Sequence, residues 1–246
     1  MIELLLPILF LSSVLVAIHS YFGLRILKRG IIFTDLAIGQ IAAVGSSISV
    51  AFFEAQFLYL WTLGFALFGA ALIQYAVRSL RHIEAFIGLL YVLGASSVML
   101  ILSHSPEGSE HFNALLAADI LFTSESHILS ATAIYALVGL LLWYLMPRIK
   151  TSYQELLFFT LLAVTVTSSV QLAGVLVVFV LLIAPALLAL MQQRFNPYGV
   201  AVTIGSLLSW AAIISSFYLD LPTGYSIVFF TALSAVFVAL FKDRKD

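Results

Sequence analysis

Long apolar runs dominate this chain and decide what it can fold into. An α-helix needs about 20 consecutive apolar residues to cross the hydrocarbon core of a bilayer. Nine stretches approach or reach that length: Leu4–Leu24, Ile31–Phe53, Phe57–Val77, Ala85–Leu102, Ile128–Met146, Leu156–Ser169, Leu172–Met191, Tyr198–Leu219 and Tyr225–Phe241. Only 9% of residues are charged, whereas soluble domains have about 25%. We predict an all-α, polytopic transmembrane helical bundle of about nine spans, with residues 1–246 forming a single transmembrane domain.

The boundary between the sixth and seventh runs is the least clearly marked of the boundaries between predicted spans. Leu156 to Met191 is one unbroken apolar stretch. A break near Ser168 is suggested by a group of polar residues and one glycine: Thr165, Thr167, Ser168, Ser169, Gln171 and Gly174. The positive-inside rule supports two spans, because nine spans place all 11 Lys and Arg residues on one side. A single merged span would put Arg194 and the basic C-terminus on opposite faces. We therefore predict nine spans, with the N-terminus outside and the C-terminus inside.

The residue types exclude several kinds of chemistry. The chain has no cysteine, so any metal ligands must be imidazole, carboxylate, amide or hydroxyl groups. It has no phosphate-binding glycine loop, no nucleophile elbow and no HExxH motif, so we predict that it is not an enzyme and does not hydrolyse ATP itself. The basic residues are dispersed among turns, which gives no indication of a nucleic-acid partner.

Two ionisable residues interrupt the first two apolar runs. Asp35 lies six residues after Arg29, and His19 lies six residues before Arg25. In a helical hairpin both would lie about 9 Å from the turn and could face each other. A charged group inside a span is costly and indicates a function by default. His19 and Asp35 could contact a divalent cation in a transport path, or they could form a structural pair that locks two helices. Asp35 could also pair with a nearby Arg.

Gln40 is the third polar candidate. Five residues correspond to about 140° on a helix, so Gln40 and Asp35 share a face only if the helix is distorted, for instance at Gly39. Small residues around this segment, including Gly45, would let another helix approach closely.

Three residues are secondary candidates for contacts with a cation. Glu84 begins the fourth run, where a carboxylate also favours the helix dipole. Glu110 and His111 belong to Ser103–His127, the longest segment between spans. We predict that this segment is on the outer side, where it would either attract cations or act as an ordinary solvated loop.

Four segments resemble a known family when taken in order: LKRGIIFTDLAIGQIAAVG, HIEAFIGLLYVLG, LLAADILFTS and VQLAGVLVVFVLLIAPALLAL, the last followed near the end of the chain by DLPTG. Together they are similar to the membrane permease subunit of bacterial ABC importers for zinc, manganese or iron. Asp35 matches the family's intramembrane Asp, and Gln40 stands where the family has His. The chain thus resembles a Gln-bearing variant branch, in which His19 would supply the missing imidazole.

The resemblance implies an inner-membrane homodimer in contact with lipid. It further implies a separate ATP-binding subunit, an extracytoplasmic metal-binding protein and a transported divalent metal ion, with no permanently bound cofactor. One segment departs from the family: MPRIKTSYQEL, after the fifth span, is shorter than the family's cytoplasmic segment. Two other functions remain open from the residues alone, an ion-coupled secondary metal carrier and a non-transporting membrane scaffold.

Overall fold

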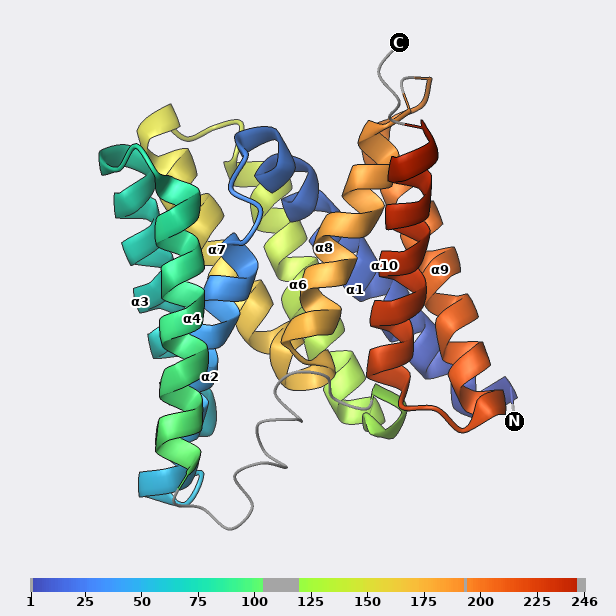
Figure 1. Cartoon of the computed structure of the whole chain (residues 1–246), viewed down its shortest axis with the longest axis horizontal. Coiled ribbons are helices and arrows are strands. Elements are labelled where there is room, and N and C mark those ends of the chain that lie inside the picture. The colour runs from blue at the N-terminus through green and yellow to red at the C-terminus, as the bar shows by residue number, and fades with distance from the viewer. Residues whose placement is uncertain (1, 104–119, 193, 243–246) are drawn as a thin grey trace. The chain divides into compact units, whose positions relative to one another are not determined.

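All the regular elements of the residues that the structure describes are helices, joined by short turns (Figure 1). The computed structural model describes residues 2–103, 120–192 and 194–242. Its elements are α1 (Ile2–Arg29), α2 (Thr34–Phe53), α3 (Leu58–Ser79), α4 (Ile83–Leu102), the 3₁₀ turn η1 (Ile120–Phe122), α6 (Glu125–Leu145), α7 (Thr151–Ala173), α8 (Val175–Leu190), α9 (Pro197–Leu219) and α10 (Thr223–Lys242). The predicted all-α class is confirmed, and each predicted run corresponds to one helix.

Eight of the described helices are long and apolar enough to cross a membrane. The remaining one, α8, is an apolar helix of 16 residues. Its shortness reflects where the chain breaks, because α7 and α8 divide one continuous apolar stretch between them.

The predicted division of this stretch into two helices is confirmed, and the break falls at Gly174, the last of the residues predicted to form it, because α7 continues to Ala173. Hydroxyl groups in this stretch bond back to the preceding turn: Thr165 Oγ1 donates to Leu161 O at 2.8 Å, and Ser169 Oγ donates to Thr165 O at 2.7 Å. Such bonds satisfy the polar side chains inside a continuous helix. The break occurs at Gly174, whose φ of 85° is accessible to glycine at little cost.

The described chain forms two compact units. The first contains Met1–Gly30, Ala117–Tyr135 and Leu172–Asp246, and the second contains Ile31–Leu116 and Ala136–Gln171. Among the described residues, only Gly30 and Gly174 are glycines with positive φ. Each lies at, or within a few residues of, a point where the chain passes from one unit to the other.

In the first unit, α1 packs against α8 and α9, and α10 packs against α8 and α9. Glycines allow these approaches. A β-carbon on Gly205 would lie 2.7 Å from Val16 Cγ1 and 2.8 Å from Pro185 Cγ. The indole Nε1 of Trp210 also donates to Leu9 O at 3.0 Å. Small residues and interhelical polar contacts of this kind are what holds helices together in lipid.

In the second unit, α2 lies beside α3 and α4 (Figure 1). A β-carbon on Gly45 of α2 would clash with the carbonyl oxygen of Trp61 in α3. On another side, a β-carbon on Gly94 of α4 would lie 2.9 Å from Gln40 Cβ. The small residues predicted to permit close approach therefore lie at real helix contacts, and 15 of the 20 residues of α2 are buried.

Candidate functional site

Asp35 lies in the first turn of α2 and is only 2% exposed. Within the described residues, neither carboxylate oxygen has a hydrogen-bond partner that meets normal geometry. The neighbouring polar groups are backbone N–H groups at the start of its own helix, where a negative charge is favoured by the helix dipole. A buried carboxylate without a full set of partners is uncommon and requires an explanation.

The turn that leads into α2 is tied to α4. Glu84, in the first turn of α4, accepts a hydrogen bond from the backbone N–H of Ile32 at 2.8 Å. Beside this contact, Thr34 Oγ1 donates to Ile31 O at 2.7 Å, and Gly30 has a φ of 68°. The Glu84 carboxylate thus contacts another segment instead of only favouring its own helix dipole. Its predicted contact with a cation stays a prediction.

Gln40 is buried in α2, with 2% of its surface exposed. The helix runs without interruption from Thr34 to Phe53, so Gly39 causes no distortion. Gln40 is therefore about 140° around the helix from Asp35, and its Cβ faces Gly94 of α4. The structure does not place Gln40 and Asp35 on one face, and the metal-contact role of Gln40 stays a prediction.

His19 is fully buried in α1, in the first unit. Its Nδ1 lies 2.7 Å from Leu15 O. Because a carbonyl oxygen only accepts, Nδ1 must carry the proton. In a neutral ring Nε2 then has a free lone pair, and this atom has no hydrogen-bond partner among the described residues. This is the tautomer in which imidazole binds metals through Nε2. Its pairing with Asp35, which belongs to the second unit, stays a prediction.

The described ranges contain no group of three or more His, Asp or Glu side chains that could hold a metal ion. Glu110 and His111, predicted as secondary contacts, lie outside the described residues. The described residues therefore offer single buried donor groups, those of Asp35 and His19. They do not form a closed structural metal site of three or four protein ligands.

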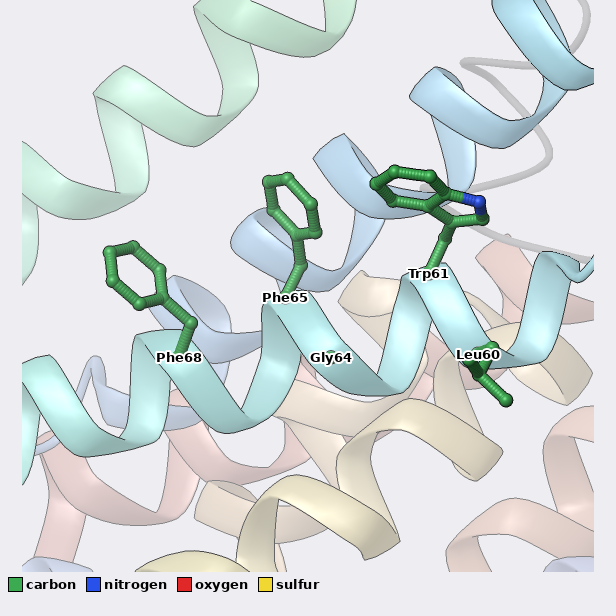
Figure 2. Close-up of a pocket in the computed structure, with 5 residues that line it drawn as sticks. All are labelled: Leu60, Trp61, Gly64, Phe65 and Phe68. Carbon is green, nitrogen blue, oxygen red and sulfur yellow. The ribbon is translucent and has the colours of Figure 1, made fainter.

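An apolar hollow of about 520 Å³ lies on α3, lined by Leu60, Trp61, Gly64, Phe65 and Phe68. Figure 2 shows the three aromatic rings on one side of the helix, with Leu60 pointing to the other. None of these side chains is a ligand for a cation, so the hollow is not a candidate cation site. The sequence shows an aromatic-rich α3, but only the structure shows that Gly64 has open space beside it.

A comparison with protein families decides the identity. The sequence profile described as the ABC 3 transport family matches residues 1–242, nearly the whole chain. The chain belongs to the ABC 3 transport family. It is a multi-pass membrane protein and the permease subunit of an ABC transporter, as the sequence segments predicted.

Individual relatives of this ABC 3 permease are distant but extend over most of its length. A Haemophilus influenzae protein described as a probable iron transport system membrane protein is 24% identical over 259 residues, covering 98% of this chain and 90% of the relative. The structure of PsaBC from Streptococcus pneumoniae in complex with Fab has a TM-score of 0.79 at 18% identity, covering 97% of this chain and 91% of that one.

A second solved structure shares the fold of the ABC 3 permease. It is a metal-chelate type ABC transporter in an inward-facing conformation, with a TM-score of 0.70 at 19% identity. It covers 96% of this chain and 84% of that one. Both structural likenesses confirm the helical fold that the apolar runs predicted.

Proposed function

We propose that this permease imports a divalent metal cation, zinc, manganese or iron, as part of an ABC importer. The observation that carries the proposal is the Asp35 carboxylate, buried in a span without a hydrogen-bond partner among the described residues. A charge in that setting is functional by default. The iron-transport description of one relative supports this substrate class.

The proposed path uses few and weak contacts. Asp35 supplies a carboxylate oxygen and His19 supplies Nε2, whose lone pair the Leu15 contact leaves free. Gln40, on another face of α2, makes a separate contact through its amide oxygen. Ions must leave a path as readily as they enter it, so sites of two or three transient ligands suit transport better than a closed cage. The cation is the cargo, and no cofactor is permanently bound.

The proposed importer contains an inner-membrane homodimer of this chain. Each copy forms a single permease domain over residues 1–246. An extracytoplasmic metal-binding protein delivers the ion, and a separate ATPase subunit drives the switch between outward and inward states. We propose nine membrane crossings, including the short α8, with the N-terminus outside. All 11 Lys and Arg residues then lie on the cytoplasmic side.

The first test is a pull-down of the tagged permease from its native membrane in mild detergent, with partners identified by mass spectrometry. Recovery of a soluble ATP-binding subunit is expected, and it would show that the short segment around Pro147–Lys150 suffices for docking. If no ATPase is recovered while a control importer in the same extract keeps its own, an ion-coupled carrier or a scaffold replaces the importer. Metal uptake that stops when an ion gradient is removed would identify the carrier.

A further inference from the structure

The hydrogen bond from the Ile32 N–H to Glu84 joins segments that are 52 residues apart in the chain. Both lie in the second unit. Glu84 belongs to the first turn of α4, and Ile32 belongs to the turn that precedes α2. The 2.8 Å distance is that of a direct bond, and a charged acceptor makes such bonds roughly twice as strong as neutral ones.

The Ile32 N–H lies outside the hydrogen-bond ladder of α2. The N-cap residue is Phe33 and the helix begins at Thr34, so Ile32 belongs to the turn and not to the helix. The backbone N–H of Thr34 donates to Ile31 O at 3.2 Å. The carboxylate of Glu84, which comes from α4, is the acceptor that the structure shows for the Ile32 N–H.

Asp35 follows Ile32 by three residues, which is less than one helical turn. A shift of the turn would therefore move the Asp35 carboxylate along and around the axis of α2. We propose that Glu84 is a positioning residue for Asp35: by holding the Ile32 N–H, it fixes the depth and direction at which Asp35 meets the transported cation. This inference rests on the proposed function of Asp35 in transport. Glu84 acts through the backbone of Ile32 and does not bind the ion.

Two substitutions separate the effect of the length of the Glu84 side chain from the effect of its charge. Glu84→Gln keeps the length of the side chain and an acceptor oxygen but loses the charge. Glu84→Asp keeps the charge but is one methylene shorter, so it does not span the distance to Ile32. A positioning role predicts that Gln is tolerated and Asp is not. A role as cation ligand or as partner of the α4 dipole predicts the opposite order.

The matched control is Glu155→Ala. Glu155 is also an acidic residue near a helix start of the second unit, and it pairs with Arg78 at 2.9 Å. That ion pair is partly exposed, and exposed pairs contribute little. This pair joins α3 to α7 and does not include the turn before α2. Because Glu155 lies close to the proposed docking segment, uptake by the control is also normalised to the ATPase that is recovered with it, and this normalised uptake should be unchanged.

The experiment measures initial uptake of Mn²⁺, Fe²⁺ and Zn²⁺ by cells that express the complete importer, normalised to permease in the membrane. We expect Glu84→Ala and Glu84→Asp to lower uptake about tenfold, the loss equivalent to one hydrogen bond to a charged group. The ratio among the three metals should also change, because a misplaced carboxylate discriminates differently. Glu84→Gln keeps the acceptor oxygen but weakens the bond by losing the charge, so it should lower uptake by about threefold at most. Glu155→Ala should behave like the wild type.

Several outcomes would overturn the inference. Normal uptake by Glu84→Asp would do so. Equal loss of uptake by Glu84→Gln and Glu84→Asp would also do so. A third such outcome is a fall in uptake of all three metals that disappears once uptake is normalised to the amount of permease. A wild type that takes up none of the three metals would refute the proposed function itself. Amide hydrogen exchange at Ile32 provides a readout independent of transport: it should accelerate in Glu84→Asp and not in Glu84→Gln, and unchanged exchange in both refutes the contact.

Discussion

Helices α2 and α3 are neighbours of similar length and hydropathy, yet they have opposite surroundings. Fifteen of the 20 residues of α2 are buried, including Asp35, Gln40 and three serines, whereas α3 buries six of 22. Several large side chains of α3 are exposed, among them Leu60, Phe68 and Tyr75. Hydropathy alone does not distinguish the two helices. The distribution of small and polar residues does, because polar groups in a span must be enclosed by protein.

The largest expected effect follows from filling the contact between the two helices. Gly45→Leu would place side-chain atoms where the Trp61 carbonyl and the Phe65 Cβ now lie. Backbone cannot move aside easily, so we expect a loss of about 3 kcal/mol of stability and little permease in the membrane. Thermal unfolding of the purified protein in detergent measures this. A Gly45→Leu protein as stable as the wild type would mean that α2 and α3 do not pack through this glycine.

Asp35→Asn should separate function from stability. Losing one charged contact to the cation should lower metal uptake about tenfold or more. The unfolding temperature should stay the same or rise, because a neutral amide is less costly to bury than a carboxylate without partners. Uptake assays in cells measure the first effect, and thermal unfolding of the permease purified from those cells measures the second. Normal uptake by this variant would remove Asp35 from the transport path.

Gln40→Leu should have a smaller effect than Asp35→Asn. Gln40 is on a different face of α2 and packs at Gly94, so its removal leaves the Asp35 carboxylate in place. Polar contacts between helices in membranes average about 0.6 kcal/mol, and we expect uptake to fall about threefold or less. A loss as large as that of Asp35→Asn would show that the two residues act on the ion together.

The smallest expected effect on stability comes from a substitution in α3. A β-carbon on Gly64 meets nothing within 4 Å, so Gly64→Leu should fill the apolar hollow and change stability by no more than about 0.5 kcal/mol. The same substitution at Gly88 of α4, which also has open space, is the matched control. Strong impairment by Gly64→Leu alone would show that another chain of the assembled transporter covers this face.

Much of the architecture could be predicted from sequence, because hydropathy is a local signal. The apolar runs match the helices closely, and Asp35 stands out as a lone carboxylate in such a run. The sequence predicts a break between α7 and α8 among several Thr, Ser and Gln residues and Gly174, but it does not say which residue forms it. The hydroxyls of Thr165 and Ser169 bond to their own helix and do not end it. Gly174 ends it, because its φ of 85° is a conformation that glycine adopts at little cost.

Contacts between distant segments could not be predicted. Nothing in the pattern around Glu84 indicates that its carboxylate reaches Ile32, because the partner is a backbone N–H that every residue type except proline has. The facing of His19 and Asp35 across a helical hairpin stays a prediction, because the two residues belong to different units.

The one-residue joint between α7 and α8 has a practical consequence for mapping this protein. Ala173 ends one helix and Val175 begins the next, so there is no loop in which a protease could cut or an epitope tag could be inserted. Exposed turns tolerate both. The segment after α6, around Arg148, and the segment before α9, around Phe195, are the places where tags will report on which side of the membrane the chain emerges.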